Sequence, residues 1–362
     1  MALDRLDLSH PTARLGLGLA AVGRPGYINL GRDRDLPADR SVEAMRARSH
    51  ELLDAAYAAG VRYVDAARSY GRAEEFLAAW LDTRDVPDVV IGSKWGYTYT
   101  AGRRVDAPVH ETKDHSLAVY ERQLAETREL LGDRLDLYQI HSLTVESPAL
   151  RDTTLHQRLA HLTATGVTVG FSSSGPRQRD AIEAALAIEV DGLPLFRSVQ
   201  ATWNLLEPSA GPALAAARAA GCQVIVKEAL ANGRLAVAGS GTAAVDGPAA
   251  AADAPAAAAA GSGPARAGSG ELGADRLGVD QLGVLAEVAA ETGATPDAVA
   301  IAAVLAQPWA GIVLSGAATA GQLATNLDGT RLSLTPAQLD RLAPLAEPAE
   351  EYWKHRATLP WA

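Results

Sequence analysis

Residues 61–71, VRYVDAARSYG, decide how the rest of this sequence is interpreted. The first four residues are rich in β-branched and aromatic side chains, which predicts a short strand that delivers Asp65 at its end. The chain then turns through Ser69 and Gly71, with Tyr70 between them. A carboxylate and a phenol where one strand becomes a loop are common in α/β proteins, so their meaning depends on how other strands end.

The alternation of a short β-rich run with a longer helical run continues along most of the chain. Candidate strands begin at eight positions: Arg14, Val61, Val89, Leu135, Val167, Ser198, Gln223 and Gly311. Eight strand–helix units predict the α/β class and a closed parallel (β/α)8 barrel, the TIM barrel. The runner-up is an open nucleotide-binding sheet, which is disfavoured because no G-x-G-x-x-G opens a helix after the first strand.

Two segments lie outside the eight units. Thr335 and Pro336, followed by Gln338, form a helix start with a capping box, which predicts an extra C-terminal helix. Residues 239–273 are mostly Ala, Gly, Pro and Ser, and they cannot bury enough apolar surface to offset their ordering entropy. We expect a flexible, disordered insertion after the seventh strand, within a single domain that spans residues 1–362.

Composition limits the classes of partner. The formal net charge is −10 and the pI is near 5.3, which argues against nucleic acid and anionic membranes as partners. Cys222 is the single cysteine, so an intrachain disulfide and a thiolate metal cluster are excluded. The histidines show no metal-ligand spacing, and we predict no metal site. No signal peptide or membrane span is predicted, so a cytoplasmic location is expected, whereas the oligomeric state cannot be read.

Polar side chains also end the third and fourth predicted strands. Residues 89–94 finish at Lys94, and residues 135–141 finish at His141. Because the carboxyl ends of barrel strands meet at one mouth, four side chains are expected to lie together there: Asp65, Tyr70, Lys94 and His141.

This set has a coherent proton-transfer chemistry. A phenol has a pKa of about 10, so it exchanges a proton poorly at neutral pH unless its surroundings help. The ammonium of Lys94 would lower the pKa of Tyr70, and Asp65 would hold that lysine in place. The imidazole of His141 can donate a hydrogen bond to a substrate oxygen, which leaves Tyr70 as the general acid or base.

The flanks of these residues resemble motifs of the aldo-keto reductase family. Asp65 and Tyr70 match its D-T-A-x-x-Y-G signature, although Ala66 stands where threonine is usual. Lys94 matches the lysine of its x-x-T/S-K strand, and residues 136–141 match D-L-Y-Q-I-H in full. The resemblance covers nearly the whole chain and implies that the four residues are a catalytic tetrad.

The resemblance also implies a nicotinamide site at the barrel mouth. Residues 169–173 resemble the family's I-G-V-S-N strand, with Ser173 in place of asparagine. Gln200 and Trp203 match Q-x-x-W/Y-N, where the family reads the carboxamide and stacks the nicotinamide ring. The residues implied on this side of the cofactor are Gly18, Leu19, Ser172, Ser173, Gln200 and Trp203.

Two more segments resemble those that hold the phosphates and adenine. Residues 230–235 resemble L-A-x-G-x-L, and residues 315–326 resemble P-G-x-x-K-x-x-R/Q-L-x-E-N. Ala318 and Thr319 stand where basic residues usually bind the 2′-phosphate, so the cofactor is NADP or NAD. The implied contacts are Leu230, Gly233, Leu235, Gly316, Gln322 and Asn326, and candidate replacement cations are Arg234, Arg266 and Arg276.

The loops suggest walls for a substrate site but not its ligand. Tyr27 in the first loop, and Trp95 and Tyr97 after the third strand, could form an aromatic wall. The resemblance implies an NAD(P)-dependent oxidoreductase that moves a hydride between nicotinamide and a carbonyl or alcohol carbon of an aldehyde, ketone or sugar. Two alternatives stay open: an NAD-dependent sugar or alcohol dehydrogenase, and a nicotinamide-binding sensor or regulatory protein with little turnover.

Overall fold

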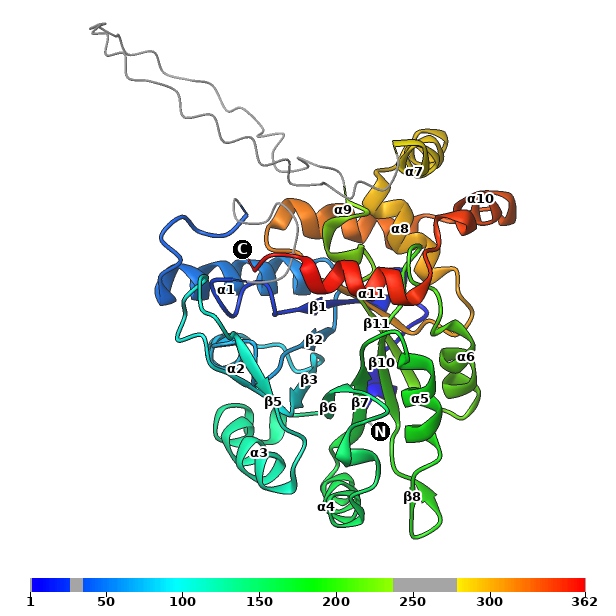
Figure 1. The fold of residues 1–362 in the computed structure, drawn as a ribbon. Coiled ribbons are helices and arrows are strands. Elements are labelled where there is room, and N and C mark those ends of the chain that lie inside the picture. Colours follow the sequence, from blue (N-terminus) through cyan, green and yellow to red (C-terminus); the bar gives the residue numbers. More distant parts are fainter. Residues whose placement is uncertain (1, 27–34, 237–278, 362) are drawn as a thin grey trace, which may run out of the picture.

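The computed structural model describes residues 2–26, 35–236 and 279–361, and a closed barrel of parallel strands forms its centre (Figure 1). Around the ring the strands follow the order β1-β12-β11-β10-β7-β6-β3-β2. Their bounds are β1 Leu15–Gly18, β2 Tyr63–Asp65, β3 Val90–Trp95, β6 Leu137–Leu143, β7 Thr168–Ser173, β10 Ser198–Thr202, β11 Gln223–Lys227 and β12 Ile312–Ser315. Each strand begins within two residues of a predicted start, and the (β/α)8 prediction is confirmed.

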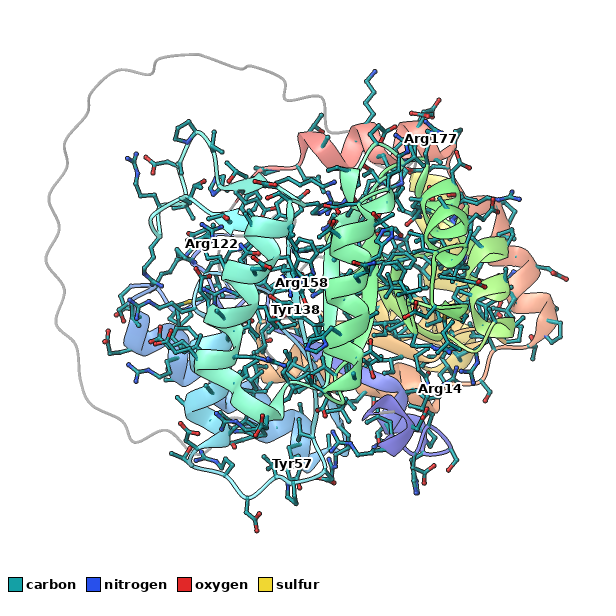
Figure 2. The ribbon with its side chains drawn as sticks, turned by 90° about the horizontal axis from the view of Figure 1, so that it is seen from below. Arg14, Tyr57, Arg122, Tyr138, Arg158 and Arg177 are labelled. Carbon is teal, nitrogen blue, oxygen red and sulfur yellow. The ribbon has the colours of Figure 1, made fainter. Side chains whose placement is uncertain are left out.

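Helices surround the barrel and cover its outer face. Their bounds are α1 Val42–Ala58, α2 Ala73–Leu81, α3 Leu117–Leu131, α4 Thr153–Ala164, α5 Gln178–Leu186, α6 Gly211–Ala219, α7 Val279–Thr292, α8 Pro296–Leu305 and α9 Ala320–Arg331. Seen from below, α3 and α4 carry the exposed Arg122 and Arg158, while Tyr138 on β6 is buried (Figure 2). The outer face of each strand is covered by helices, and its inner face is packed in the barrel core. Every residue of β2, β3 and β7 is therefore buried.

Two short hairpins project from the barrel. One pairs β4 Tyr97–Tyr99 with β5 Glu111–Lys113, and the other pairs β8 Glu189–Val190 with β9 Leu193–Pro194. The first hairpin follows β3 directly, so it rises beside the end of the strand that carries Lys94.

Side-chain caps define several helix starts that the sequence marks. Thr295 accepts a hydrogen bond from the N–H of Ala298 at the start of α8. Thr335 and Gln338 form the expected capping box of α10 Pro336–Leu342. One extra C-terminal helix was expected and two are present, because α11 Ala349–Thr358 follows α10 and lies across the barrel near β10 and β11 (Figure 1).

Some sequence predictions concern residues outside the described ranges or other sites. The proposed insertion at 239–273 lies outside the described residues. Within the described residues, no group of three or more His, Cys, Asp or Glu side chains could hold a metal ion. In the same ranges no single helix is long and apolar enough to cross a membrane, although Gly283–Thr292 and Pro296–Leu305 meet the criterion as a pair bent by 86°.

Candidate active site

The ends of β2, β3 and β6 bring Asp65, Lys94 and His141 to one mouth of the barrel, and the loop after β2 adds Tyr70. Lys94 is completely buried, and its ammonium forms an ion pair with Asp65. The same ammonium donates to the carbonyl oxygen of Ala66 at 2.9 Å and to the hydroxyl of Tyr70 at 3.3 Å. All three N–H groups of Lys94 are therefore used, which fixes Nζ beside the phenol.

Asp65 is held from its own strand and from across the barrel. Its Oδ1 accepts from the Tyr63 hydroxyl at 3.2 Å and from Gln200 Nε2 at 2.9 Å, while Oδ2 faces Lys94. A buried carboxylate is unfavourable without such partners. These contacts leave Asp65 with one orientation, which in turn aims Lys94 at Tyr70.

The ring of His141 packs edge-on against two tyrosines. Its centre lies 5.5 Å from that of Tyr70 and 5.0 Å from that of Tyr97. Burial, together with the charges of Lys94 and Lys227, holds the pKa of His141 well below its ordinary value. The imidazole is therefore neutral at physiological pH and has one N–H to donate.

His115 fixes the backbone that carries His141. Its Nε2 lies 2.8 Å from the carbonyl oxygen of His141, and its Nδ1 lies 2.6 Å from the Ser147 hydroxyl. A carbonyl oxygen can only accept, so Nε2 carries the proton and Nδ1 accepts from Ser147. Burial lowers the pKa of His115 to about 4. His115 therefore supports the position of His141 through the backbone.

The pKa of Tyr70 moves in the opposite direction from the one expected beside a lysine. Burial raises it well above 10, the Asp65 charge raises it further, and the charge of Arg24 lowers it. Because the Lys94 charge is matched by the adjacent Asp65, the pair lends little net positive potential to the phenol. This direction of the pKa keeps Tyr70 a protonated phenol at neutral pH.

Arg24 is a residue of this site that the sequence did not single out. Its Nη1 donates to the carbonyl oxygen of Ser69 at 2.9 Å and to Glu111 Oε2 at 2.9 Å. A Cβ on Gly23 would lie 2.2 Å from the Tyr70 carbonyl oxygen, so glycine is needed for this loop to approach. In the sequence, the arginine that directly follows Gly23 in the loop after the first strand was the feature that could have pointed to this residue.

Lys227 and Glu228, at the end of β11, were also missed. Lys227 Nζ donates to Thr202 Oγ1 at 2.9 Å, and Glu228 binds Arg356 of α11 through both of its carboxylate oxygens. Lys94 was chosen as a candidate because it is a charged residue at the carboxyl end of a barrel strand. Lys227 and Glu228 meet the same criterion and could have been chosen in the same way.

The residues expected near the nicotinamide lie on barrel strands or directly after them. Gly18 ends β1 and Leu19 follows it, and the Leu19 N–H donates to the Asp65 carbonyl oxygen at 2.9 Å. Ser172 Oγ accepts from the Ser142 N–H at 2.8 Å. Of the residues expected around the nicotinamide, Ser173 and Gln200 each have one buried polar atom, Ser173 Oγ and Gln200 Oε1, that has no hydrogen-bond partner within the described residues.

The aromatic residues expected at the site divide into two groups. Tyr97 lies against His141, whereas Trp95 is completely buried beside His115 and Tyr120. Trp203 packs edge-on against Trp309 and lines a cavity of about 150 Å³ with Leu205, Pro208 and Ala303, away from the tetrad. These positions do not support a substrate wall at Trp95 or a stacking platform at Trp203. Tyr27 lies outside the described residues.

The segment expected to wrap the pyrophosphate is a closed turn. The N–H groups of Gly233 and Leu235 both donate to the Leu230 carbonyl oxygen, at 3.0 and 3.2 Å. Arg234 is paired with Glu347 through both guanidinium nitrogens. Neither the two N–H groups nor Arg234 is therefore directed at a phosphate here, and Arg266 and Arg276 lie outside the described residues.

The segment expected near the adenosine is partly open. Gly316 is exposed, and a Cβ built on it would meet no atom within 4 Å. Gln322 accepts from the Ala318 N–H at 2.9 Å and donates to Asp35 Oδ2 at 2.6 Å. Asn326 is buried, with its Oδ1 bonded to Ser315 at 2.7 Å. Arg48 donates to the carbonyl oxygens of Asp35 and Ala318, so a cation does reach this segment from α1.

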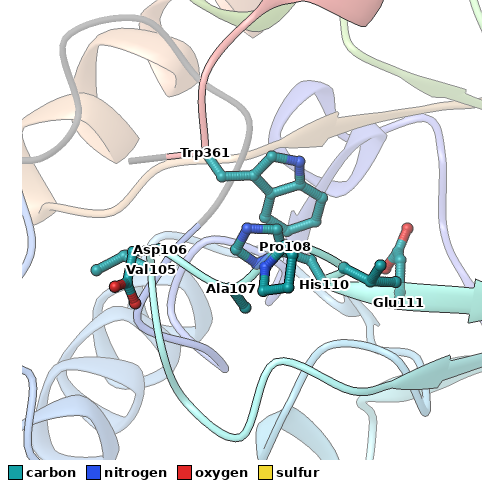
Figure 3. A pocket seen from close by; sticks show the side chains of 8 residues that line it. Val105, Asp106, Ala107, Pro108, His110, Glu111 and Trp361 are labelled. Carbon is teal, nitrogen blue, oxygen red and sulfur yellow. The ribbon is translucent and has the colours of Figure 1, made fainter.

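A cavity of about 530 Å³ opens between the loop that joins β4 to β5 and Trp361 near the C-terminus (Figure 3). It is lined by residues 105–111 and Trp361, whose indole stacks on His110 with ring centres 4.1 Å apart. The Arg24 guanidinium lies 4.7 Å from the Trp361 ring and contacts Glu111. Two lining residues, Glu111 and Trp361, therefore contact Arg24, which in turn binds the Ser69 carbonyl oxygen.

Comparisons with known proteins agree with this geometry. A model of the Aldo/keto reductase family matches residues 15–347. An aldo-keto reductase of Strobilurus tenacellus is 24% identical over 351 residues, covering 94% of this chain and 93% of that protein.

Solved structures share the fold. An aldo-keto reductase from Bacillus halodurans, in its holo form, gives a TM-score of 0.62 at 19% identity, covering 94% of this chain and 95% of the other. A glycerol dehydrogenase from Gluconobacter oxydans gives a TM-score of 0.62 at 20% identity, covering 92% and 90%. Because the family model spans most of the sequence, this chain belongs to the aldo/keto reductase family of nicotinamide-dependent oxidoreductases.

Proposed function

We propose that this chain reduces the carbonyl group of an aldehyde or ketone, with Tyr70 giving its proton to the carbonyl oxygen. The observation that carries the proposal is the position of Lys94 Nζ, which contacts both Asp65 and the Tyr70 hydroxyl while His141 lies beside the same phenol. Titratable groups buried together in this way are typical of proton-transfer sites. The arrangement favours an enzyme over a binding protein with little turnover.

Each residue has a distinct part in the proposed reaction. The carbonyl oxygen enters between Tyr70 and His141 and accepts a hydrogen bond from each. As the carbonyl carbon gains a hydride, negative charge develops on its oxygen, the Tyr70 proton moves there, and an alcohol O–H forms. Lys94 then donates a hydrogen bond to the phenolate left on Tyr70, Asp65 keeps Lys94 in place, and Arg24 supplies the positive charge beside the ring. The reduced nicotinamide, when bound, supplies the hydride.

The polar atoms near β7 and β10 fit a nicotinamide carboxamide. Ser173 Oγ and Gln200 Oε1 are buried and lack partners among the described residues, and buried polar atoms are normally satisfied. A carboxamide brings two donors and one acceptor, which complement a hydroxyl and an amide oxygen. Ser173 and Gln200 are therefore the residues that we assign to this part of the cofactor.

We further infer a preference for NAD over NADP. The carboxylate of Asp35 is bonded to Gln322 of the segment expected near the adenosine, and Arg48, which also contacts this segment, is engaged by two backbone carbonyls and paired with Glu51. A carboxylate accepts from a ribose hydroxyl and repels a 2′-phosphate.

The state of Tyr70 favours reduction over oxidation as the main direction. Its raised pKa keeps the phenol protonated at neutral pH, and a protonated phenol is the acid that carbonyl reduction needs. Oxidation of an alcohol needs the phenolate and is expected to become efficient only at alkaline pH.

The test is a panel of aldehydes and ketones assayed with NADH and NADPH, using the wild type and Tyr70→Phe. The variant should lose reduction by about 10²- to 10⁴-fold and keep its affinity for the dinucleotide, because the hydroxyl acts on the substrate. Tyr57→Phe, on the outer helix α1, is the matched control and should behave like the wild type. Turnover of the panel by Tyr70→Phe at near wild-type rates would contradict the assignment of the acid.

A further inference from the structure

Charged groups of both signs surround the proposed reaction centre. The basic groups whose charge reaches His141 include Lys94, Lys227 and Arg24. The carboxylates whose charge reaches Tyr70 are Asp65, Glu111 and Glu228. Whether the mouth favours an anion or a cation depends on how these groups are paired.

Each carboxylate has a close basic partner. Asp65 pairs with Lys94, and Glu111 accepts from Arg24 at 2.9 Å. Glu228 takes its partner from outside this set, because Arg356 Nε lies 3.0 Å from each of its carboxylate oxygens and Nη2 lies close to one of them.

Lys227 is the basic group of this set without a hydrogen-bonded carboxylate. Its Nζ lies 3.9 Å from Glu228 Oε1, which is close enough for an ion pair but too far for a hydrogen bond, and the same oxygen is bonded to Arg356. Within the described residues its ammonium has one hydrogen-bond acceptor, the Thr202 hydroxyl at 2.9 Å. An ammonium has three N–H groups, so two remain for a ligand.

The position of Lys227 makes those N–H groups available at the mouth. The residue ends β11, as Lys94 ends β3, and 16% of its side chain is exposed. Thr202 ends the neighbouring β10 and is paired in register with Lys227. Burial lowers the pKa of Lys227 to about 8, so the amine remains largely protonated at neutral pH. Burial deprives the ammonium of hydration by water, and an anion bound at Lys227 would offset this loss through charge–charge attraction.

We propose that Lys227 binds an anionic oxygen of the substrate, so that the substrate is a carbonyl compound that also carries a carboxylate or a phosphate. The inference rests on the proposed carbonyl reduction at Tyr70. It adds the substrate class, which is an oxo acid or a phosphorylated aldehyde or ketone whose charged group lies on the β10–β11 side of the mouth. Lys227 is a binding residue and takes no part in proton transfer.

The experiment compares two substrates of nearly the same shape, 4-carboxybenzaldehyde and the neutral 4-carbamoylbenzaldehyde. Wild type should favour the acid in kcat/KM, and Lys227→Met should lose about 10- to 100-fold for the acid alone, as expected for one charge-assisted hydrogen bond. Lys227→Arg should restore part of the preference. Lys354→Met, on the exposed face of α11, is the matched control and should leave the preference unchanged.

A binding measurement distinguishes a role of Lys227 in substrate binding from a role in cofactor binding. Trp353 lies 5.8 Å from Lys227 Nζ, so its fluorescence can follow titration with benzoate or benzamide at saturating NADH. Benzoate should bind the wild type more tightly, and Lys227→Met should remove the difference while the Kd for NADH stays the same. Equal losses for both aldehydes, or a loss confined to NADH binding, would overturn the inference, the latter by assigning Lys227 to the cofactor. If neither aldehyde is reduced, the proposed function fails, and the benzoate titration still decides the role of Lys227.

Discussion

The guanidinium of Arg24 lies 5.5 Å from the centre of the Tyr70 ring and is bonded to the carbonyl oxygen of Ser69, the residue before Tyr70. This contact places a fixed positive charge beside the phenol. Burial and Asp65 raise the pKa of Tyr70, and Arg24 opposes them, so the arginine rather than the neutralised Lys94–Asp65 pair supplies the compensating charge.

Replacing Arg24 should therefore shift the pH dependence of the enzyme. In alcohol oxidation the rate rises with pH as Tyr70 becomes the phenolate base. Arg24→Gln should raise the Tyr70 pKa and move that rise to higher pH. Glu111→Gln should move it to lower pH, because the Glu111 charge raises the same pKa. The measurement is kcat/KM for oxidation against pH, and a shift of the same sign in both variants would contradict the electrostatic account.

Lys94→Met should separate stability from activity. The substitution leaves Asp65 as a buried carboxylate without its cation, which typically costs about 3–5 kcal/mol of unfolding free energy. The double variant Asp65→Asn with Lys94→Met removes the unpaired charge and should recover much of this loss, yet remain inactive. Urea unfolding and carbonyl reduction measure the two effects. An active double variant would show that Lys94 is structural.

Stability should fall on mild acidification because of His115. The pKa of His115 is about 4 in the folded protein, mainly through burial, against 6.5 ordinarily, so the unfolded chain binds the proton more readily. The loss should begin below about pH 6.5 and grow until about pH 4. His115→Asn should show a smaller drop in unfolding free energy between pH 7 and pH 5 than the wild type. The exposed His161→Asn serves as control, and an unchanged drop in His115→Asn would count against this assignment.

The cofactor preference should depend on Asp35. Asp35→Asn removes the negative charge beside Gln322 and should improve the affinity for NADPH relative to NADH by about tenfold, since one favourable charge contact is worth roughly 1–2 kcal/mol. Tryptophan fluorescence titration with both dinucleotides measures the ratio. Asp328→Asn, on the exposed side of α9, is the control. A wild type that already prefers NADPH would contradict the inferred role.

The sequence was sufficient to predict the barrel and the meeting of Asp65 with Lys94, since both follow from strand spacing and from the rule that strand ends converge. The position of Trp95 could have been predicted from the alternation of side chains along a strand. Successive side chains of a strand point to opposite faces. Lys94 points into the mouth, so Trp95 faces the surrounding helices, where it contacts Tyr120 of α3.

Other features depend on contacts that no local pattern contains. Trp203 follows the inward-facing Thr202 and packs on Trp309, more than a hundred residues later. The pairing of Glu228 with Arg356 depends on where α11 docks, and that docking is what leaves Lys227 without a carboxylate at hydrogen-bond distance. The pKa of Tyr70 could not be predicted either, because burial outweighs the effect of the neighbouring lysine.

The hydrogen bond between Gln200 and Asp65 joins β10 to β2, and these strands stand four places apart in either direction around the ring of eight. This bond therefore spans the full diameter of the barrel and acts as a cross-brace. The orientation of Asp65, which aims Lys94 at the phenol, therefore depends on the position of β10 as well as on that of its own strand. The carboxylate at the centre of the proposed proton chemistry is thus supported from two opposite walls of the barrel, which lie 135 residues apart in the sequence.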